Sequence, residues 1–100
     1  MKLKSNKICE FIKHHIILFE KFNNVYLFGS ILDSKKVPND IDILLIYSNY
    51  YNEMINDLIF IRTILEKNCE LPVDFTVLSE DEEKETDFLS RISSSCVKLK

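Results

Sequence analysis

Two aspartates stand two positions apart at the start of the most strand-like stretch of this sequence. Asp40 and Asp42 alternate with Ile41 and Ile43. Because successive side chains of a strand point to opposite faces, both carboxylates are expected on one face and both isoleucines in the core. Hard divalent ions such as Mg²⁺ take oxygen ligands of this kind and keep positions open for phosphate oxygens. The pair therefore predicts a magnesium site, with a simple turn-capping role for Asp40 as the alternative.

A Gly-Ser pair lies upstream of the two aspartates. Gly29 and Ser30 directly follow residues 25–28, an apolar run that predicts a buried strand. The glycine permits close approach of the backbone to a ligand. Ser30 offers a hydroxyl and a backbone N–H where a short helical turn is expected to begin, which is a favourable place for a phosphate. Most Gly-Ser pairs are plain turns, so the signal comes from the strand before the pair and the aspartates after it.

A third aspartate interrupts another predicted strand. Asp74 lies within residues 72–78, which are otherwise mostly apolar or β-branched. A lone carboxylate in such a strand is costly unless it is paired, exposed at an edge or bound to a metal. If this strand pairs beside residues 40–47, Asp74 joins the other two carboxylates. The alternative is an aspartate on a solvated sheet edge.

The elements that must position these residues follow from hydrophobic periodicity. Ser79 and Glu82 have the spacing of a capping box, which predicts a helix continuing to Phe88, Leu89 and Ile92. The expected elements are a helix over 6–22, a strand over 25–28, a loop over 30–39 with a helical turn near its start, a strand over 40–47, a helix over 50–67, a strand over 72–78, the helix capped by Ser79, and an edge strand over 97–99. This order predicts an α/β (α+β) fold, a small mixed β-sheet with helices packed on it, as a single domain over residues 1–100.

Composition narrows the class of protein. With 46% hydrophobic and 29% charged residues, the chain is expected to be globular. A net charge of −3 argues against a broad nucleic-acid surface. Three cysteines without a CxxC pair argue against a zinc ribbon and favour a reducing cytoplasmic location. The apolar runs are too short to span a membrane, so no membrane association is expected.

Three segments together resemble a known superfamily. Residues 27–30 (LFGS), 40–43 (DIDI) and 73–75 (VDF) look like the motifs of the DNA polymerase β-type nucleotidyltransferases, and in particular of the minimal nucleotidyltransferases, which are similar in length and element order. The resemblance covers nearly the whole chain, and its specificity depends on the region 25–48. It implies the polymerase β-like nucleotidyltransferase fold.

The resemblance also implies roles for five residues. Asp40 and Asp42 would hold two Mg²⁺ ions, and Asp74 would hold the catalytic ion and help to deprotonate the acceptor. Gly29 and Ser30 would hold the β- and γ-phosphates of a nucleoside triphosphate, with ATP as the expected substrate. An acceptor hydroxyl would then attack the α-phosphorus and pyrophosphate would leave.

For the acceptor, the resemblance implies a helical HEPN-type protein, with this chain as the antitoxin of a toxin–antitoxin pair that carries out AMPylation. One departure keeps a second hypothesis open, a module that neutralises its partner by binding alone. Many minimal members have an Arg and a second Gly after Gly-Ser, whereas residues 31–34 here are Ile-Leu-Asp-Ser. Lys35 and Lys36 could supply replacement charge. A small-molecule transferase resembling antibiotic-modifying enzymes is the third reading, against which the short length argues, and an oligomer is left open.

Several other residues of reactive types receive no site. Adjacent histidines on a helix point in different directions, and tyrosines near a sheet edge usually pack, with stacking on a base as the lesser alternative. These residues are His14, His15, Tyr47, Tyr50, Tyr51 and Arg62.

Overall fold

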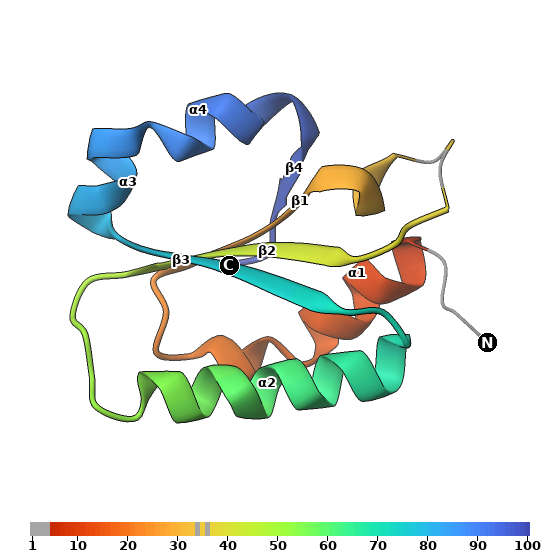
Figure 1. Cartoon of the computed structure of the whole chain (residues 1–100), viewed down its shortest axis with the longest axis horizontal. Helices are drawn as coiled ribbons and strands as arrows, with labels where there is room; N and C mark the ends of the chain where they lie inside the picture. The colour runs from red at the N-terminus through yellow and green to blue at the C-terminus, as the bar shows by residue number, and fades with distance from the viewer. Residues whose placement is uncertain (1–4, 34, 36) are drawn as a thin grey trace.

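A computed structural model describes residues 5–33, 35 and 37–100 of the chain (Figure 1). The elements are α1 (Ser5–His14), the 3-10 helix η1 (Ile16–Phe19), β1 (Asn24–Phe28), the 3-10 helix η2 (Gly29–Leu32), β2 (Ile41–Tyr47), α2 (Met54–Cys69), β3 (Val73–Ser79), α3 (Glu80–Thr86), α4 (Phe88–Ile92), the 3-10 helix η3 (Ser93–Ser95) and β4 (Cys96–Lys98). The strands form one sheet in the order β3-β2-β1-β4. Strands β2 and β3 are parallel and the other two pairs are antiparallel. The predicted mixed sheet with helices packed on it is confirmed.

Helices cover the two faces of the sheet unequally. In Figure 1, α1, η1 and α2 lie below the sheet, and α3 and α4 lie above it. The lower face holds the main core, in which side chains of α1, η1 and α2 meet alternate residues of the strands. Its fully buried members include Ile8, Ile12, Phe19, Val25, Leu27, Ile41, Ile43, Leu45, Ile61 and Leu65. On the upper face, the ring of Phe88 in α4 lies 5.6 Å from that of Phe28 in β1.

The first predicted helix is shorter in the structure than in the sequence analysis. It ends at His14, and the chain continues as η1. The run after His14 contains two consecutive β-branched residues, Ile16 and Ile17, which lower helix propensity. A 3-10 helix brings side chains three positions apart onto one side, so Phe19 is buried beneath the sheet while Ile17 stays exposed.

The helix that follows β3 begins as predicted and breaks early. The Ser79 hydroxyl accepts a hydrogen bond from the Glu82 N–H, and the Glu82 carboxylate accepts one from the Ser79 N–H, which confirms the capping box. The expectation of one continuous helix was wrong, because Asp87 adopts a left-handed conformation with φ 53° and separates α3 from α4. Aspartate is one of the few residues that tolerate this conformation. The turn directs α4 back over the sheet.

The remaining predicted elements lie within two residues of their expected bounds, including the edge strand β4 beside β1, except that α2 begins at Met54 and not at residue 50. Two residues of the predicted loop, Ser34 and Lys36, lie outside the described residues. Within residues 5–33, 35 and 37–100, no helix combines the length and apolar character that a bilayer span requires.

Candidate active site

Strand β2 directs a carboxylate to one face of the sheet and apolar side chains to the core on the other face. Ile41 and Ile43 are fully buried against the lower helices. Asp42 therefore points to the upper face, as does Asp40 just before the strand. Both carboxylates are partly exposed. Asp42 pairs with Phe28 of β1, whose ring contacts Phe88 of α4, so α4 approaches the aspartates from the β1 side.

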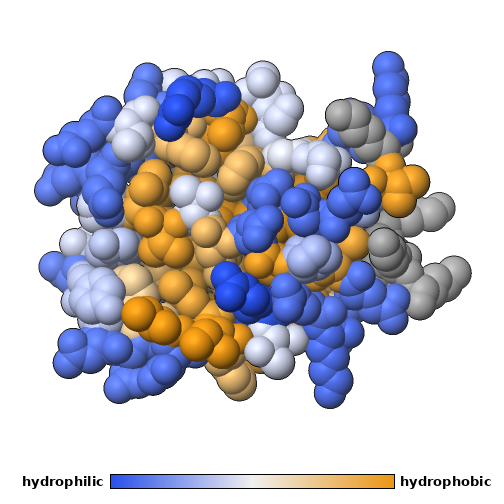
Figure 2. All heavy atoms as spheres, viewed as in Figure 1, coloured by the Kyte–Doolittle hydropathy of each residue, from blue (hydrophilic) through white to orange (hydrophobic). Residues whose placement is uncertain are grey.

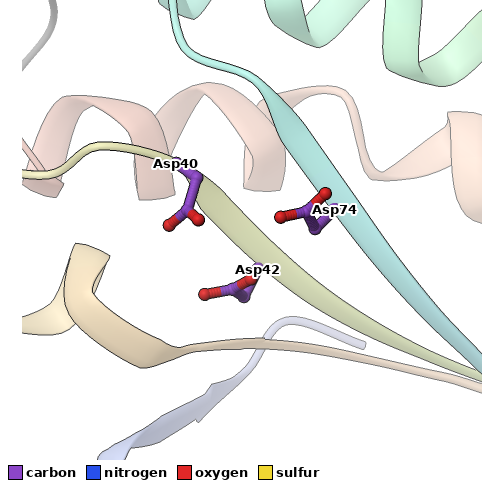
Figure 3. Close-up of side chains that lie close together, drawn as sticks. All are labelled: Asp40, Asp42 and Asp74. Atoms are coloured by element: carbon purple, nitrogen blue, oxygen red, sulfur yellow. The ribbon is translucent and has the colours of Figure 1, made fainter.

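Strand β3 brings the third carboxylate to the same place. In the parallel pairing of β2 and β3, Asp42 and Asp74 are direct partners, and directly paired residues place their side chains on one face. One oxygen from each of Asp40, Asp42 and Asp74 lies within 4.8 Å of the others. Figure 3 shows the three side chains leaving the two adjacent strands on the same side. This convergence was predicted on the condition that the two strands pair, and their parallel pairing brings all three residues together.

The electrostatics of this cluster favour a cation. Burial raises the pKa of the Asp42 carboxyl, and the nearby carboxylates of Asp40 and Asp74 raise it further. Within the part of the chain that the structure describes, no lysine, arginine or histidine forms an ion pair with any of the three. Three oxygen donors within reach of one point match the ligand preference of Mg²⁺, so the residues present fit a divalent ion.

The Gly-Ser turn lies directly against this cluster. Gly29 has φ +85°, a left-handed backbone that side chains rarely adopt, and a Cβ built on it would lie 2.5 Å from Oδ2 of Asp42. The left-handed backbone favours glycine here, and any added side chain would require the Asp42 carboxylate to move. Ser30 follows in η2, which lies above the sheet in Figure 1. The turn thus places Gly29 next to Asp42, with Ser30 directly after it in η2.

Comparison with known proteins bears on what this arrangement is. The sequence matches the family described as polymerase beta, nucleotidyltransferase over residues 6–97. The chain belongs to the polymerase β nucleotidyltransferase family. Among curated proteins no relative matches it.

Solved structures with this fold include chains from toxin–antitoxin complexes. One comes from the complex of a tri-AMPylated Shewanella oneidensis HEPN toxin with MNT antitoxin, at 18% identity and a TM-score of 0.54, with 92% of this chain and 71% of that one covered. Another comes from a toxin–antitoxin structure with AMP-PNP, at 21% identity and a TM-score of 0.58, with 98% and 73% covered. At these identities the likeness establishes the fold.

The segment after the Gly-Ser turn of this nucleotidyltransferase domain packs inward. Ile31 is fully buried and belongs to the main core. Asp33 closes the turn, because its backbone N–H donates to the Ser30 carbonyl at 3.0 Å and its carboxylate accepts from the Lys35 N–H at 2.9 Å. The described residues of this segment are anchored by apolar burial and by local hydrogen bonds. Among them, Lys35 offers the only side-chain cation.

Two side chains of α2 that were not predicted to belong to the site hold the residue next to Asp74. The Val73 N–H donates to the Glu66 carboxylate at 2.8 Å, and Nε of Arg62 donates to the Val73 carbonyl at 3.2 Å. The Arg62 guanidinium also lies over the ring of Phe75, 5.4 Å from its centroid. Only the four-residue spacing of Arg62 and Glu66 on one helix face could have indicated a shared contact.

The tyrosines and histidines lie away from the triad. Tyr47 pairs with Ser79 at the opposite end of β2 from Asp42, and five residues of strand span roughly 16 Å. Its ring contacts Tyr50, whereas the Tyr51 hydroxyl donates to Asp57 at 2.9 Å. At the end of α1, the ring of His15 stacks on that of Phe11 and contacts that of His14. These residues make packing contacts and contribute nothing to the carboxylate cluster.

Proposed function

We propose that this domain is a minimal nucleotidyltransferase that transfers AMP from Mg–ATP to a hydroxyl of a partner protein, as the antitoxin of a HEPN/MNT-type pair. The observation that carries the proposal is the convergence of three carboxylates beside a Gly-Ser turn in a domain of the polymerase β nucleotidyltransferase family. The toxin–antitoxin complexes that share the fold, one of them with an AMPylated HEPN toxin, support AMP as the transferred group.

Each residue of the site would have a role that follows from its position. Gly29 and Ser30 would bind the β- and γ-phosphates through backbone N–H groups and the serine hydroxyl. Asp40 and Asp42 would hold the metal, and Mg²⁺ bound there would supply neutralisation of the charge on the triphosphate. Asp74 is exposed on strand β3, where an acceptor can approach. Its carboxylate would take the proton of the acceptor hydroxyl as the hydroxyl oxygen attacks the α-phosphorus and the bond to pyrophosphate breaks. Most of the acceleration would come from positioning and charge complementarity.

A protein acceptor has an apolar surface to use. Ile17 of η1 and Ile55, Ile59 and Phe60 of α2 are each more than half exposed. Ile17 and Phe60 also line a cavity of about 320 Å³ between η1 and α2. Hydrophobic atoms reach the surface along the lower edge of Figure 2, where α2 lies. Exposed apolar surface is typical of protein interaction sites, which supports a protein partner.

The alternative function is neutralisation of the partner by binding without transfer. It draws support from the segment after Ser30, where Ile31 is buried and the described residues carry no arginine. A triphosphate there would be held by the turn, the metal and Lys35. Binding without transfer requires only an intact partner surface and no contribution from the carboxylates.

Co-expression with the protein encoded beside it distinguishes the two functions. Intact mass spectrometry of the partner is expected to show added AMP units with the wild-type chain and none with Asp40→Ala. A stable complex with an unmodified partner would favour neutralisation by binding. Labelling of RNA or of a small molecule, with no complex formed, would refute the protein acceptor.

A further inference from the structure

Strand β3 is an edge strand, yet the outer side of its first residue is occupied. β3 pairs with β2 on one side only. The Ile41 N–H donates to the Pro72 carbonyl at 2.9 Å, so the backbone groups of Pro72 face β2. Because backbone groups of successive residues point to opposite edges of a strand, those of Val73 face away from the sheet. Such groups are ordinarily left to solvent at a sheet edge.

Two side chains of α2 take the place of a neighbouring strand at Val73. The Glu66 carboxylate accepts from the Val73 N–H, and Nε of Arg62 donates to the Val73 carbonyl. Both are charge-assisted hydrogen bonds, the one to Glu66 at 2.8 Å and the one from Arg62 at 3.2 Å. Arg62 and Glu66 lie four positions apart, on one face of the helix. They fix the donor and the acceptor of the same residue.

The next residue along the strand is Asp74, and the residues before and after it both contact α2. Val73 before it is bonded to α2, and Phe75 after it packs under the Arg62 guanidinium. The side chains of Val73 and Phe75 point to the lower face, and that of Asp74 points to the upper face. The contacts on the lower side therefore set the height and direction of the carboxylate on the upper side. Asp42 needs no such support, because β2 has strands on both of its sides.

We propose that Arg62 and Glu66 are positioning residues that hold Asp74 at the metal and acceptor site, an inference that depends on the proposed nucleotidyl transfer. Neither side chain touches the cluster, since both act through the backbone of Val73. We call this pair of side chains, Arg62 and Glu66, the clamp. It keeps the exposed carboxylate of Asp74 aligned with those of Asp40 and Asp42.

The test compares Glu66→Ala with Glu66→Gln, which keeps a carbonyl oxygen able to accept from the Val73 N–H. Lys67→Ala, an exposed position on the same helix, is the matched control. Mn²⁺ affinity is measured by electron paramagnetic resonance, and kcat and KM for ATP by transfer of labelled AMP. Glu66→Ala is expected to lower kcat and Mn²⁺ affinity by about 10-fold or more with KM for ATP changed by less than about 2-fold, the scale seen when partners that orient metal ligands are removed. Glu66→Gln is expected to recover most of both losses.

A second variant covers the possibility that Glu66→Ala does not fold. Arg62 is exposed, so Arg62→Ala tests the other half of the clamp at less risk to the core, and it is expected to show the same loss in kcat with the same steady KM. Wild-type Mn²⁺ affinity and kcat retained in both alanine variants would overturn the clamp alone. A wild-type protein that binds no Mn²⁺ would overturn the proposed function and, with it, the role of the clamp.

Discussion

The carboxylates of β2 and the carboxylate of β3 reach one site from different structural situations. Asp42 lies in an interior strand, against Gly29, with a pKa that burial and its neighbours raise. Asp74 lies exposed on an edge strand that side chains of α2 hold in place. One is fixed by the sheet itself, and the other by contacts that reach it through the backbone of Val73.

This difference assigns distinct parts to the two strands. A rigid carboxylate crowded by the Gly-Ser turn is suited to a metal that must meet the phosphates of a nucleotide at a set place. An exposed carboxylate at the open edge is suited to an acceptor that arrives from another molecule. The comparison predicts that substitutions on β2 abolish binding of the nucleotide, whereas the substitution on β3 spares binding and removes transfer.

Removal of Asp42 is expected to have the largest effect on nucleotide binding. Asp42→Ala should abolish Mg²⁺-dependent binding of ATP, with a loss of roughly 100-fold or more, because loss of a direct ligand exceeds the 10- to 100-fold cost of losing an outer partner. Isothermal titration calorimetry with and without Mg²⁺ measures it. Asp81→Ala in α3 makes the same change of charge away from the site and serves as the control. Equal and metal-independent binding in wild type and Asp42→Ala would contradict the metal assignment.

Asp74→Asn is expected to separate transfer from binding. The amide keeps the size of the carboxylate and cannot take a proton, so the rate of AMP transfer should fall on the order of 10²- to 10⁴-fold, the usual contribution of a general base. The affinity for Mg–ATP should change far less than in Asp42→Ala. Single-turnover transfer and calorimetry on the same preparation give both values. A normal transfer rate would remove Asp74 from the mechanism.

Gly29→Ala tests the close packing on the β2 side. The new Cβ would meet Oδ2 of Asp42 in a backbone with φ +85°. The free energy of unfolding is expected to drop by about 1–2 kcal/mol from the left-handed backbone alone, and binding of Mg–ATP should weaken as the carboxylate is displaced. In the Asp42→Ala background the clash is absent, so the two substitutions should couple by at least roughly 0.5 kcal/mol in a double-mutant cycle of urea denaturation. Strict additivity would show that the carboxylate moves aside freely.

The parts of this site that the sequence predicted are those that depend on local periodicity. The alternation of Asp40 and Asp42 with Ile41 and Ile43 follows from strand geometry, and the capping box at Ser79 follows from a three-residue spacing. The placement of Asp74 was conditional on the pairing of β3 with β2, which the structure supplies. These features need no knowledge of how distant helices are oriented.

The parts that the sequence did not predict depend on contacts between separate segments. Arg62 reaches Val73 only because α2 packs below the sheet within reach of β3, and periodicity does not specify that orientation. The break at Asp87 replaces a regular helix with a turn that lets Phe88 pack on Phe28. Tertiary packing of this kind overrides local helix propensity.

The smallest expected effect is on the stability of the protein without metal, and it concerns Asp42 of β2. In the folded protein the pKa of Asp42 is raised above its usual value of 3.8. The folded state therefore holds more protons than the unfolded state from about that pH upward, and stability falls as the pH rises through this window. Asp42→Asn removes the repulsion, so in EDTA at pH 7 its Tm should exceed that of wild type by on the order of a few degrees. Saturating Mg²⁺ should raise the Tm of wild type more than that of Asp42→Asn, because binding to the folded state stabilises it. Circular dichroism melts at several pH values, with Asp81→Asn as the control, measure both trends. A lower Tm for Asp42→Asn in EDTA would show that the carboxylate of β2 stabilises the fold and that its crowding carries no cost.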